Sequence, residues 1–188
     1  MTLKREERVV PPQPAAHSAC IVGPMASTAA EPSCPICRSG EPSDLIGELS
    51  SVWVTAPPLA PLPGYVCVVA KRHVAEPFQL PQAEMEAFWS ECMSVALVLH
   101  DLVRPLKMNY EIHGNSIPHL HLHLYPRFSG DPYEGRAIDG RSTEFERSPE
   151  DLARIRGAID RLCLLRQATG AVDEIRADGK EDAGQLGG

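Results

Sequence analysis

The sequence of 188 residues is poor in aromatic side chains, has no excess of positive charge and contains no long apolar run. Aromatic residues make up 5% of it, and 18 Lys and Arg stand against 25 Asp and Glu, for a formal charge of −7. No stretch approaches the roughly 18 consecutive apolar residues of a membrane-spanning helix, so no membrane association is expected. The acidic balance argues against a bulk electrostatic nucleic-acid binder but leaves room for a small phosphorylated ligand held locally.

The chain also lacks an apolar segment near its start that could act as a secretory signal. It begins MTLKREER and continues with prolines, so we expect a cytoplasmic, reducing location in which the six cysteines are free thiols or metal ligands. The length suits one globular domain with tails. We expect a flexible arm over residues 1–30, a folded domain over residues 31–168 and a disordered, acidic and glycine-rich tail over residues 169–188.

Two different hydrophobic periods predict an α+β fold. Apolar residues that recur every three or four positions predict long helices over residues 81–103 and from residue 148 to about residue 167. The proline-rich segment 57–64 is expected to interrupt any strand, because proline lacks the backbone donor. Short runs of strand-forming residues predict strands over residues 45–48, 51–56, 65–70, 107–113 and 119–125. The order of strands, helix, two strands and helix is typical of an α+β domain with neighbouring antiparallel strands.

Four of the seven histidines lie within eleven consecutive residues, at positions 113, 119, 121 and 123. Because alternate residues of a strand share one face, His119, His121 and His123 are expected to project as one row above a leucine face. Chance gives His-x-His-x-His in roughly one chain in a hundred of this composition. Three interpretations remain open: an incidental polar face, a three-imidazole metal site, or nucleophilic catalysis on a phosphate.

The third interpretation is favoured by a resemblance to the histidine triad (HIT) family. Residues 119–125, His-Leu-His-Leu-His-Leu-Tyr, resemble that family's motif of three histidines alternating with apolar residues. Gly114-Asn115-Ser116 resembles its Gly-Gln-Ser/Thr phosphate loop, with Asn in place of Gln, and Pro126-Arg127 matches many members. Residues 63–74 resemble its Pro-Gly-His signature, with Tyr65 in place of the histidine. The resemblance extends over about residues 34–166.

The resemblance implies a HIT-like fold, an antiparallel sheet of about five strands with two main helices, often dimerising through the long helix. It also implies that His121 attacks the α-phosphate of a nucleotide and forms a nucleotidyl-histidine, which water then hydrolyses. By the same resemblance His123 orients the nucleophile and contacts the phosphate, as does His119. Ser116 binds phosphate oxygens or protonates the leaving group.

Two asparagines are further candidates for substrate binding on this resemblance. Asn115 lies in the phosphate loop, and Asn109 stands where related enzymes use an asparagine near the site. The leading activity is hydrolysis of a dinucleoside polyphosphate such as diadenosine tetraphosphate, with nucleoside phosphoramidase as the alternative. Nucleotidyl transfer is disfavoured, because the transferase branch replaces the third histidine with Gln and His123 is retained here. A non-catalytic nucleotide-binding dimer is the alternative of another class, and a homodimer is expected in each case.

The pair Cys34-Pro35-Ile36-Cys37 is weak evidence for a metal when taken alone, because a chain with six cysteines shows Cys-x2-Cys by chance roughly one time in five. The resemblance to zinc-bearing bacterial HIT proteins gives it weight. It implies a closed structural zinc site made of Cys34, Cys37, His73 and His119. The alternative is two reduced thiols with His73 on the surface. If His119 binds zinc, it cannot also hold phosphate, and His121 and His123 carry the chemistry.

Overall fold

The computed structural model of the chain describes residues 31–142 and 145–181. The arm predicted over residues 1–30 therefore lies outside the described residues, as does the end of the predicted tail. Among the described helices, none has both the length and the apolar character needed to cross a membrane.

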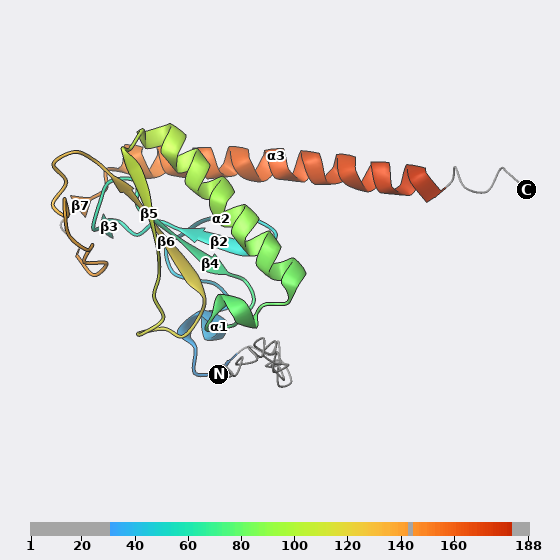
Figure 1. The fold of residues 1–188 in the computed structure, drawn as a ribbon, viewed down its shortest axis with the longest axis horizontal. Coiled ribbons are helices and arrows are strands. Elements are labelled where there is room, and N and C mark those ends of the chain that lie inside the picture. The colour runs from blue at the N-terminus through green and yellow to red at the C-terminus, as the bar shows by residue number, and fades with distance from the viewer. Residues whose placement is uncertain (1–30, 143–144, 182–188) are drawn as a thin grey trace, which may run out of the picture.

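A five-stranded antiparallel sheet forms the centre of the domain (Figure 1). Its strands follow the order β1-β2-β4-β6-β5, so β5 is an edge strand. They are β1 (Leu45–Glu48), β2 (Val52–Thr55), β4 (Val66–Ala70), β6 (His121–Arg127) and β5 (Lys107–Ile112). This sheet confirms the predicted antiparallel α+β architecture. The main difference is in β6, which was predicted over residues 119–125 and extends over residues 121–127.

A second, two-stranded sheet forms where the sequence predicts no strand. Here β3 (Leu59–Ala60) pairs with β7 (Phe145–Glu146). The prediction that residues 57–64 interrupt the strands was thus wrong for the two residues between the prolines. Both have backbone donors, so proline chemistry does not prevent their pairing.

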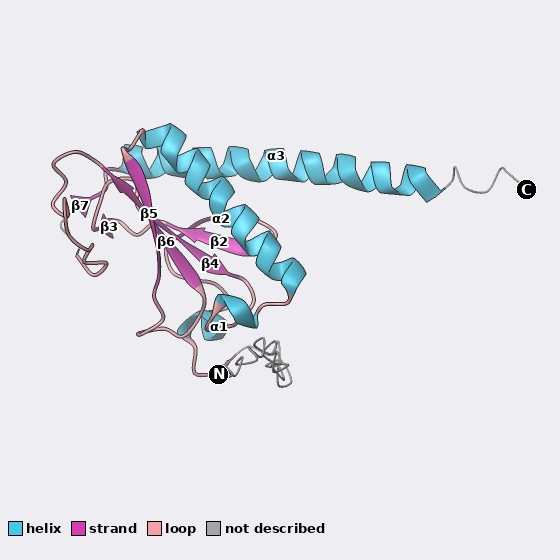
Figure 2. Cartoon of the chain, viewed as in Figure 1, coloured by secondary structure: helices cyan, strands magenta, loops and turns pink. Residues whose placement is uncertain are grey.

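Two long helices cover one face of the large sheet. Helix α2 (Gln82–Val103) and helix α3 (Pro149–Glu181) supply the buried residues predicted from their periodicity, among them Phe88, Leu99 and Ile159. Two shorter helices were not predicted, α1 (Pro35–Ser39) and the 3-10 turn η1 (Pro77–Gln79). Helix α1 lies near the N-terminal end of the described chain (Figure 2).

Helix α3 is longer than predicted and continues through residues 168–181, where a disordered tail was expected. Between Gly170 and Gly179 the tail contains alanine, glutamate and arginine, which are good helix formers. In Figure 1 this second half of α3 extends past the sheet and past α2.

The opposite face of the sheet carries the polar side chains of β6. Leu122 and Leu124 are buried in the core beneath the helices, so the alternate residues of the strand face the other way. There Tyr125 joins a small second core with Tyr65 and residues of the segments around β3 and β7. The side chains of His121 and His123 therefore lie on the face that the long helices leave open.

Helix α3 packs on β1 at a glycine, and this contact gives a test of the fold. A Cβ at Gly47 would lie 2.7 Å from Cγ2 of the fully buried Ile159. We expect Gly47→Ala to lower the free energy of unfolding by about 1–3 kcal/mol, measured by urea denaturation, because the helix must shift. Gly157→Ala, on α3 itself, is the control, since its Cβ would meet only Arg161 Nη1 at 3.6 Å. That control should gain up to about 1 kcal/mol from helix propensity. An unchanged unfolding free energy for Gly47→Ala would contradict this packing.

Candidate functional site

Four potential metal ligands meet at one edge of the large sheet. Cys34 is the N-cap of α1 and Cys37 lies within it, so one helical turn brings both thiols to the same side. His73 follows the end of β4 and His119 precedes the start of β6. Because β4 and β6 are antiparallel neighbours, these two positions lie at the same edge.

The donor atoms of this cluster converge on one point. Cys34 Sγ lies 3.4 Å from His119 Nδ1, and Cys37 Sγ lies 3.2 Å from His73 Nδ1. Nδ1 of His73 lies 3.2 Å from Nδ1 of His119, and all four ligand atoms lie within 4.8 Å of one another. The cluster, of which Cys34 and His119 are buried, can therefore hold a metal ion.

The ring of His119 is oriented for ligation by a backbone contact. Its Nε2 lies 2.8 Å from the carbonyl oxygen of Ala70. A carbonyl oxygen only accepts, so Nε2 carries the proton and Nδ1 is left with a lone pair toward the cluster. Burial lowers the pKa of His119 and favours the neutral ring that a metal ion requires.

The predicted row of three histidines is wrong at His119. The β6 ladder starts at His121, and the His119 amide donates to the Ile117 carbonyl in a tight turn. The side chain of His119 therefore leaves the strand's alternation and joins the cysteines. His121 and His123 remain together, with ring centroids 4.8 Å apart at an angle of 81°. Among the described residues, the cluster that could hold a metal combines His119 with Cys34, Cys37 and His73, and it includes neither of the other two imidazoles.

His121 has the orientation of a nucleophile. Its Nδ1 lies 2.6 Å from the carbonyl oxygen of His119 and must donate to it. The proton is thereby held on Nδ1, and Nε2 keeps a free lone pair. His121 also lines a pocket, so the lone pair is available to a ligand.

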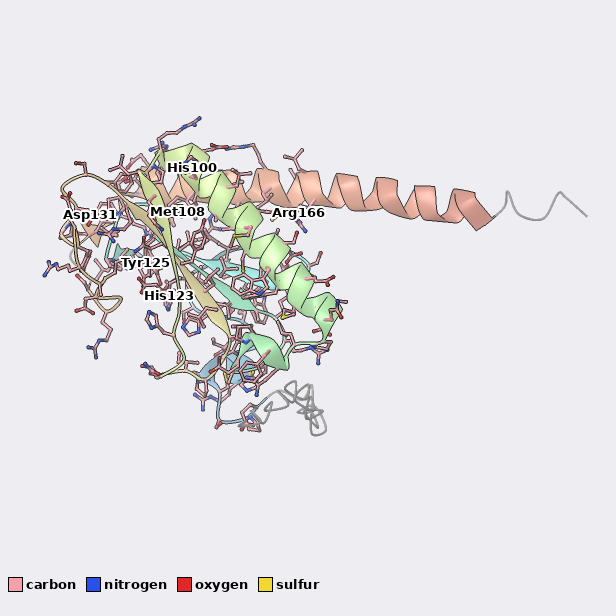
Figure 3. All side chains as sticks on the ribbon, viewed as in Figure 1. His100, Met108, His123, Tyr125, Asp131 and Arg166 are labelled. Carbon is pink, nitrogen blue, oxygen red and sulfur yellow. The ribbon has the colours of Figure 1, made fainter. Side chains whose placement is uncertain are left out.

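His123 is held between two tyrosines. Tyr65 Oη lies 2.8 Å from His123 Nδ1, and the His123 ring is stacked with that of Tyr125 at a centroid distance of 5.7 Å. His123 and Tyr125 lie close together along β6 (Figure 3). Burial, followed by the neighbouring His121 and His113, lowers the pKa of His123 to about 4.

A pocket of about 470 Å³ opens beside the two histidines. Asn115 and Ser116, both predicted to bind substrate, line it from the exposed loop between β5 and β6. Asn109 lies on β5 opposite Tyr125 and is outside the set of lining residues. His119 was also predicted to contact the substrate, but it does not line the pocket. Its ring lies in the cluster with Cys34, Cys37 and His73.

The far wall of the pocket was not predicted from the sequence. It is formed by Tyr125 and by residues 138–141, which come from the loop after β6. Bidentate hydrogen bonds from Arg127 anchor this loop and lower the pKa of Asp131 to about 2. Gly140 is required at its position, since a Cβ there would lie 2.8 Å from Tyr125 Oη. The loop has no periodic pattern from which this contact could have been predicted.

Comparisons with known proteins agree with this fold. The sequence model of the HIT domain family matches residues 39–130. A histidine triad protein from Bradyrhizobium japonicum has a similar structure, with 23% identity and a TM-score of 0.58 over 63% of this chain and 89% of that protein. No curated protein matches the sequence.

Two further solved structures have the same fold. One is a Zn-bound histidine triad family protein from Mycobacterium smegmatis, with 21% identity and a TM-score of 0.51 over 69% of this chain and 95% of that protein. The other is a hypothetical histidine triad nucleotide-binding protein from Sulfolobus tokodaii, also with 21% identity and a TM-score of 0.51, over 69% of this chain and 91% of that protein.

The environment of His123 predicts an unusual titration. The ring should stay neutral down to a midpoint of about 4, against 6.5 for an ordinary histidine, as followed by NMR. Between these two values the unfolded chain binds about one proton more at this residue, so stability should rise with pH across the window and be lost as pH falls through it. His123→Asn identifies the resonance. A midpoint near the ordinary value would contradict the burial argument.

Proposed function

Because the chain carries a HIT domain over residues 39–130, we propose that it is a nucleotide hydrolase that cleaves its substrate at the α-phosphate. The proposed substrate class is the dinucleoside polyphosphates, with diadenosine tetraphosphate as the representative. The observation that carries the proposal is the state of His121, which faces the pocket with Nδ1 bonded to a backbone carbonyl and Nε2 free. An imidazole held in this way is a nucleophile at neutral pH.

The reaction proceeds in two displacements at phosphorus. Nε2 of His121 attacks the α-phosphorus, and the bond from phosphorus to the leaving oxygen breaks as the bond from phosphorus to nitrogen forms. The positive charge that develops on the ring is stabilised by the His119 carbonyl, which accepts from Nδ1. A proton from Ser116 neutralises the leaving group. Water then attacks the phosphorus and breaks its bond to nitrogen, and the proton that the water loses returns to Ser116. The nucleoside monophosphate and free His121 are released.

The charge of the pocket suits this substrate despite the acidity of the chain. The polar groups of residues 114–116 line the pocket, and Arg141 adds a cationic donor for negatively charged oxygens. Asp139 also lines the pocket and lies 3.9 Å from Arg141, so the cationic contribution is partly offset. These contacts are local, so they need no broad basic surface. His123, on the same strand, contacts a phosphate oxygen in the proposed complex.

Nucleoside phosphoramidase activity is the second candidate. It is favoured by the position of Gly114-Asn115-Ser116, which lines the pocket where a leaving amine would need a proton. The two activities share the nucleophile and differ in the leaving group.

We also propose that the protein acts as a homodimer. Within the described part of the chain the sheet ends at β5, and no described strand pairs with its outer side. Tyr110 and Ile112 are exposed on that strand, and Leu97 is 62% exposed on α2. A second copy would cover these apolar side chains. A homodimer that binds nucleotide without turnover is the remaining alternative.

The metal ion proposed for the cysteine and histidine cluster is zinc. In a tetrahedral zinc site, bonds of about 2.3 Å to sulfur and about 2.0 Å to nitrogen place neighbouring donor atoms about 3.3–3.8 Å apart. Four of the six separations between donor atoms are 3.2–3.7 Å here, and all six lie within 4.8 Å. Zinc bound to Cys34, Cys37, His73 and His119 would tie α1 to the sheet. The predicted cytoplasmic location would keep these thiols reduced.

The enzyme proposal is tested with two substrates and one variant. Purified protein should hydrolyse diadenosine tetraphosphate, and His121→Ala should lower kcat on the order of 10³-fold or more, because the nucleophile is lost. Circular dichroism and metal content should stay unchanged in this variant. His100→Ala is the control, since His100 lies on α2 outside the pocket and should keep wild-type kcat.

The second substrate separates the alternatives. Faster turnover of adenosine 5′-phosphoramidate than of diadenosine tetraphosphate would favour the phosphoramidase. Turnover of neither, together with tight binding of a mononucleotide, would refute both activities and leave the nucleotide-binding dimer. Substantial residual activity of His121→Ala would place the nucleophile elsewhere.

The zinc proposal is tested by metal analysis of cysteine variants. Cys34→Ser should lose about one equivalent of zinc per chain and unfold at a lower temperature, because metal binding contributes to folding. Cys163→Ser is the matched control, since its Sγ donates to the Glu48 carbonyl away from the cluster and the zinc content should not change. Equal zinc content in the two variants would refute the ligand assignment.

A further inference from the structure

Tyr65 makes a contact with the catalytic pocket that the proposed mechanism does not use. It stands just before β4, at the position where the resembled signature has a histidine. Its hydroxyl lies 2.8 Å from His123 Nδ1. The two rings are stacked, with centroids 5.9 Å apart and planes at 18°.

The direction of this hydrogen bond follows from burial. Tyr65 is 6% exposed, and burial raises the pKa of its phenol far above the ordinary value, so the hydroxyl keeps its proton. A buried O–H needs an acceptor. The unprotonated Nδ1 of a neutral imidazole is a strong acceptor within reach, whereas the nearby thiol of Cys67 is a weak one. The phenol therefore donates and His123 Nδ1 accepts.

Tyr65 is itself held by the protein. Its carbonyl oxygen accepts a hydrogen bond from the buried guanidinium of Arg147, and its amide donates to the Leu62 carbonyl at 3.3 Å. Its ring stacks on that of Tyr125 with centroids 4.9 Å apart. The second small core therefore fixes the phenol before any substrate arrives.

We propose that Tyr65 is a positioning residue for His123, whose hydroxyl holds Nδ1 unprotonated and so presents the Nε2 hydrogen of that ring to the pocket. The inference rests on the proposed function for its catalytic consequence. A neutral ring with its proton on Nε2 can only donate a hydrogen bond from Nε2 to a phosphoryl oxygen. An ionisable imidazole in place of Tyr65 could donate or accept, whereas a phenol that stays protonated keeps one arrangement across the working pH range.

The tautomer of His123 is measurable without any substrate. In ¹⁵N-labelled protein, long-range ¹H–¹⁵N spectra should show His123 Nδ1 as an unprotonated, hydrogen-bonded nitrogen and Nε2 as a protonated one. In Tyr65→Phe, which keeps the stacked ring and removes only the hydroxyl, the Nδ1 resonance should shift toward that of a free ring nitrogen. Tyr125→Phe is the control, because its phenol stacks on the same ring while its oxygen has no hydrogen-bond partner among the described residues. That variant should leave the Nδ1 resonance in place.

Kinetics then test the catalytic consequence. Tyr65→Phe should lower kcat for the better substrate about tenfold, the scale of one buried hydrogen bond, with KM nearly unchanged. Tyr133→Phe is the kinetic control and should keep the wild-type kcat. It removes a phenol from the same small core, and this phenol donates to the Asp139 carbonyl at 3.5 Å. An unchanged kcat in Tyr65→Phe would overturn the positioning role.

The two proposals fail in different ways. A protonated Nδ1 in the wild-type protein, or an Nδ1 resonance that Tyr65→Phe does not move, overturns the inference even if nucleotides are hydrolysed. Absence of turnover with both nucleotides overturns the proposed hydrolase, while the hydrogen bond from Tyr65 is still decided by the spectra.

Discussion

The antiparallel pairing of β4 with β6 is the constraint on which both candidate sites depend. It sets Val69 opposite His121 and places His123 opposite Cys67. The register is fixed by Leu122 and Leu124, which are buried under the helices. A slip of one residue would bury both imidazoles and expose both leucines, so the apolar core determines which side chains reach the pocket.

The end of the same ladder brings together the cluster that can hold a metal ion. Beyond the last pair, the Ala70 amide donates to the Leu120 carbonyl and the Leu120 amide donates to that of Val74, which turns the chain out of the sheet. This turn brings His119 beside His73, above the thiols of α1. Two residues along the chain therefore separate a side chain of the metal-competent cluster from one that lines the pocket.

The sequence predicted the elements whose periodicity is long and regular, and it failed where tertiary contacts override local pattern. The strands, the two main helices and their buried faces follow from hydrophobic period. The row of histidines fails at His119, because strict alternation was extended into the turn from Ile117 to His119, which is centred on Pro118. The ligand set came from resemblance, since nothing local links Cys34 to His73. The pocket wall at residues 138–141 depends on the Arg127 anchor and on a close approach to Tyr125, neither of which leaves a repeating signal.

His119 takes part in both sites through two different chemical groups. Its imidazole belongs to the metal cluster, and its main-chain oxygen holds the proton of His121. Every amino acid supplies that oxygen, but few supply the ring. A substitution at position 119 would therefore remove a candidate metal ligand while keeping the carbonyl to which His121 donates. The two candidate sites are adjacent in space, yet they depend on different groups of this one residue.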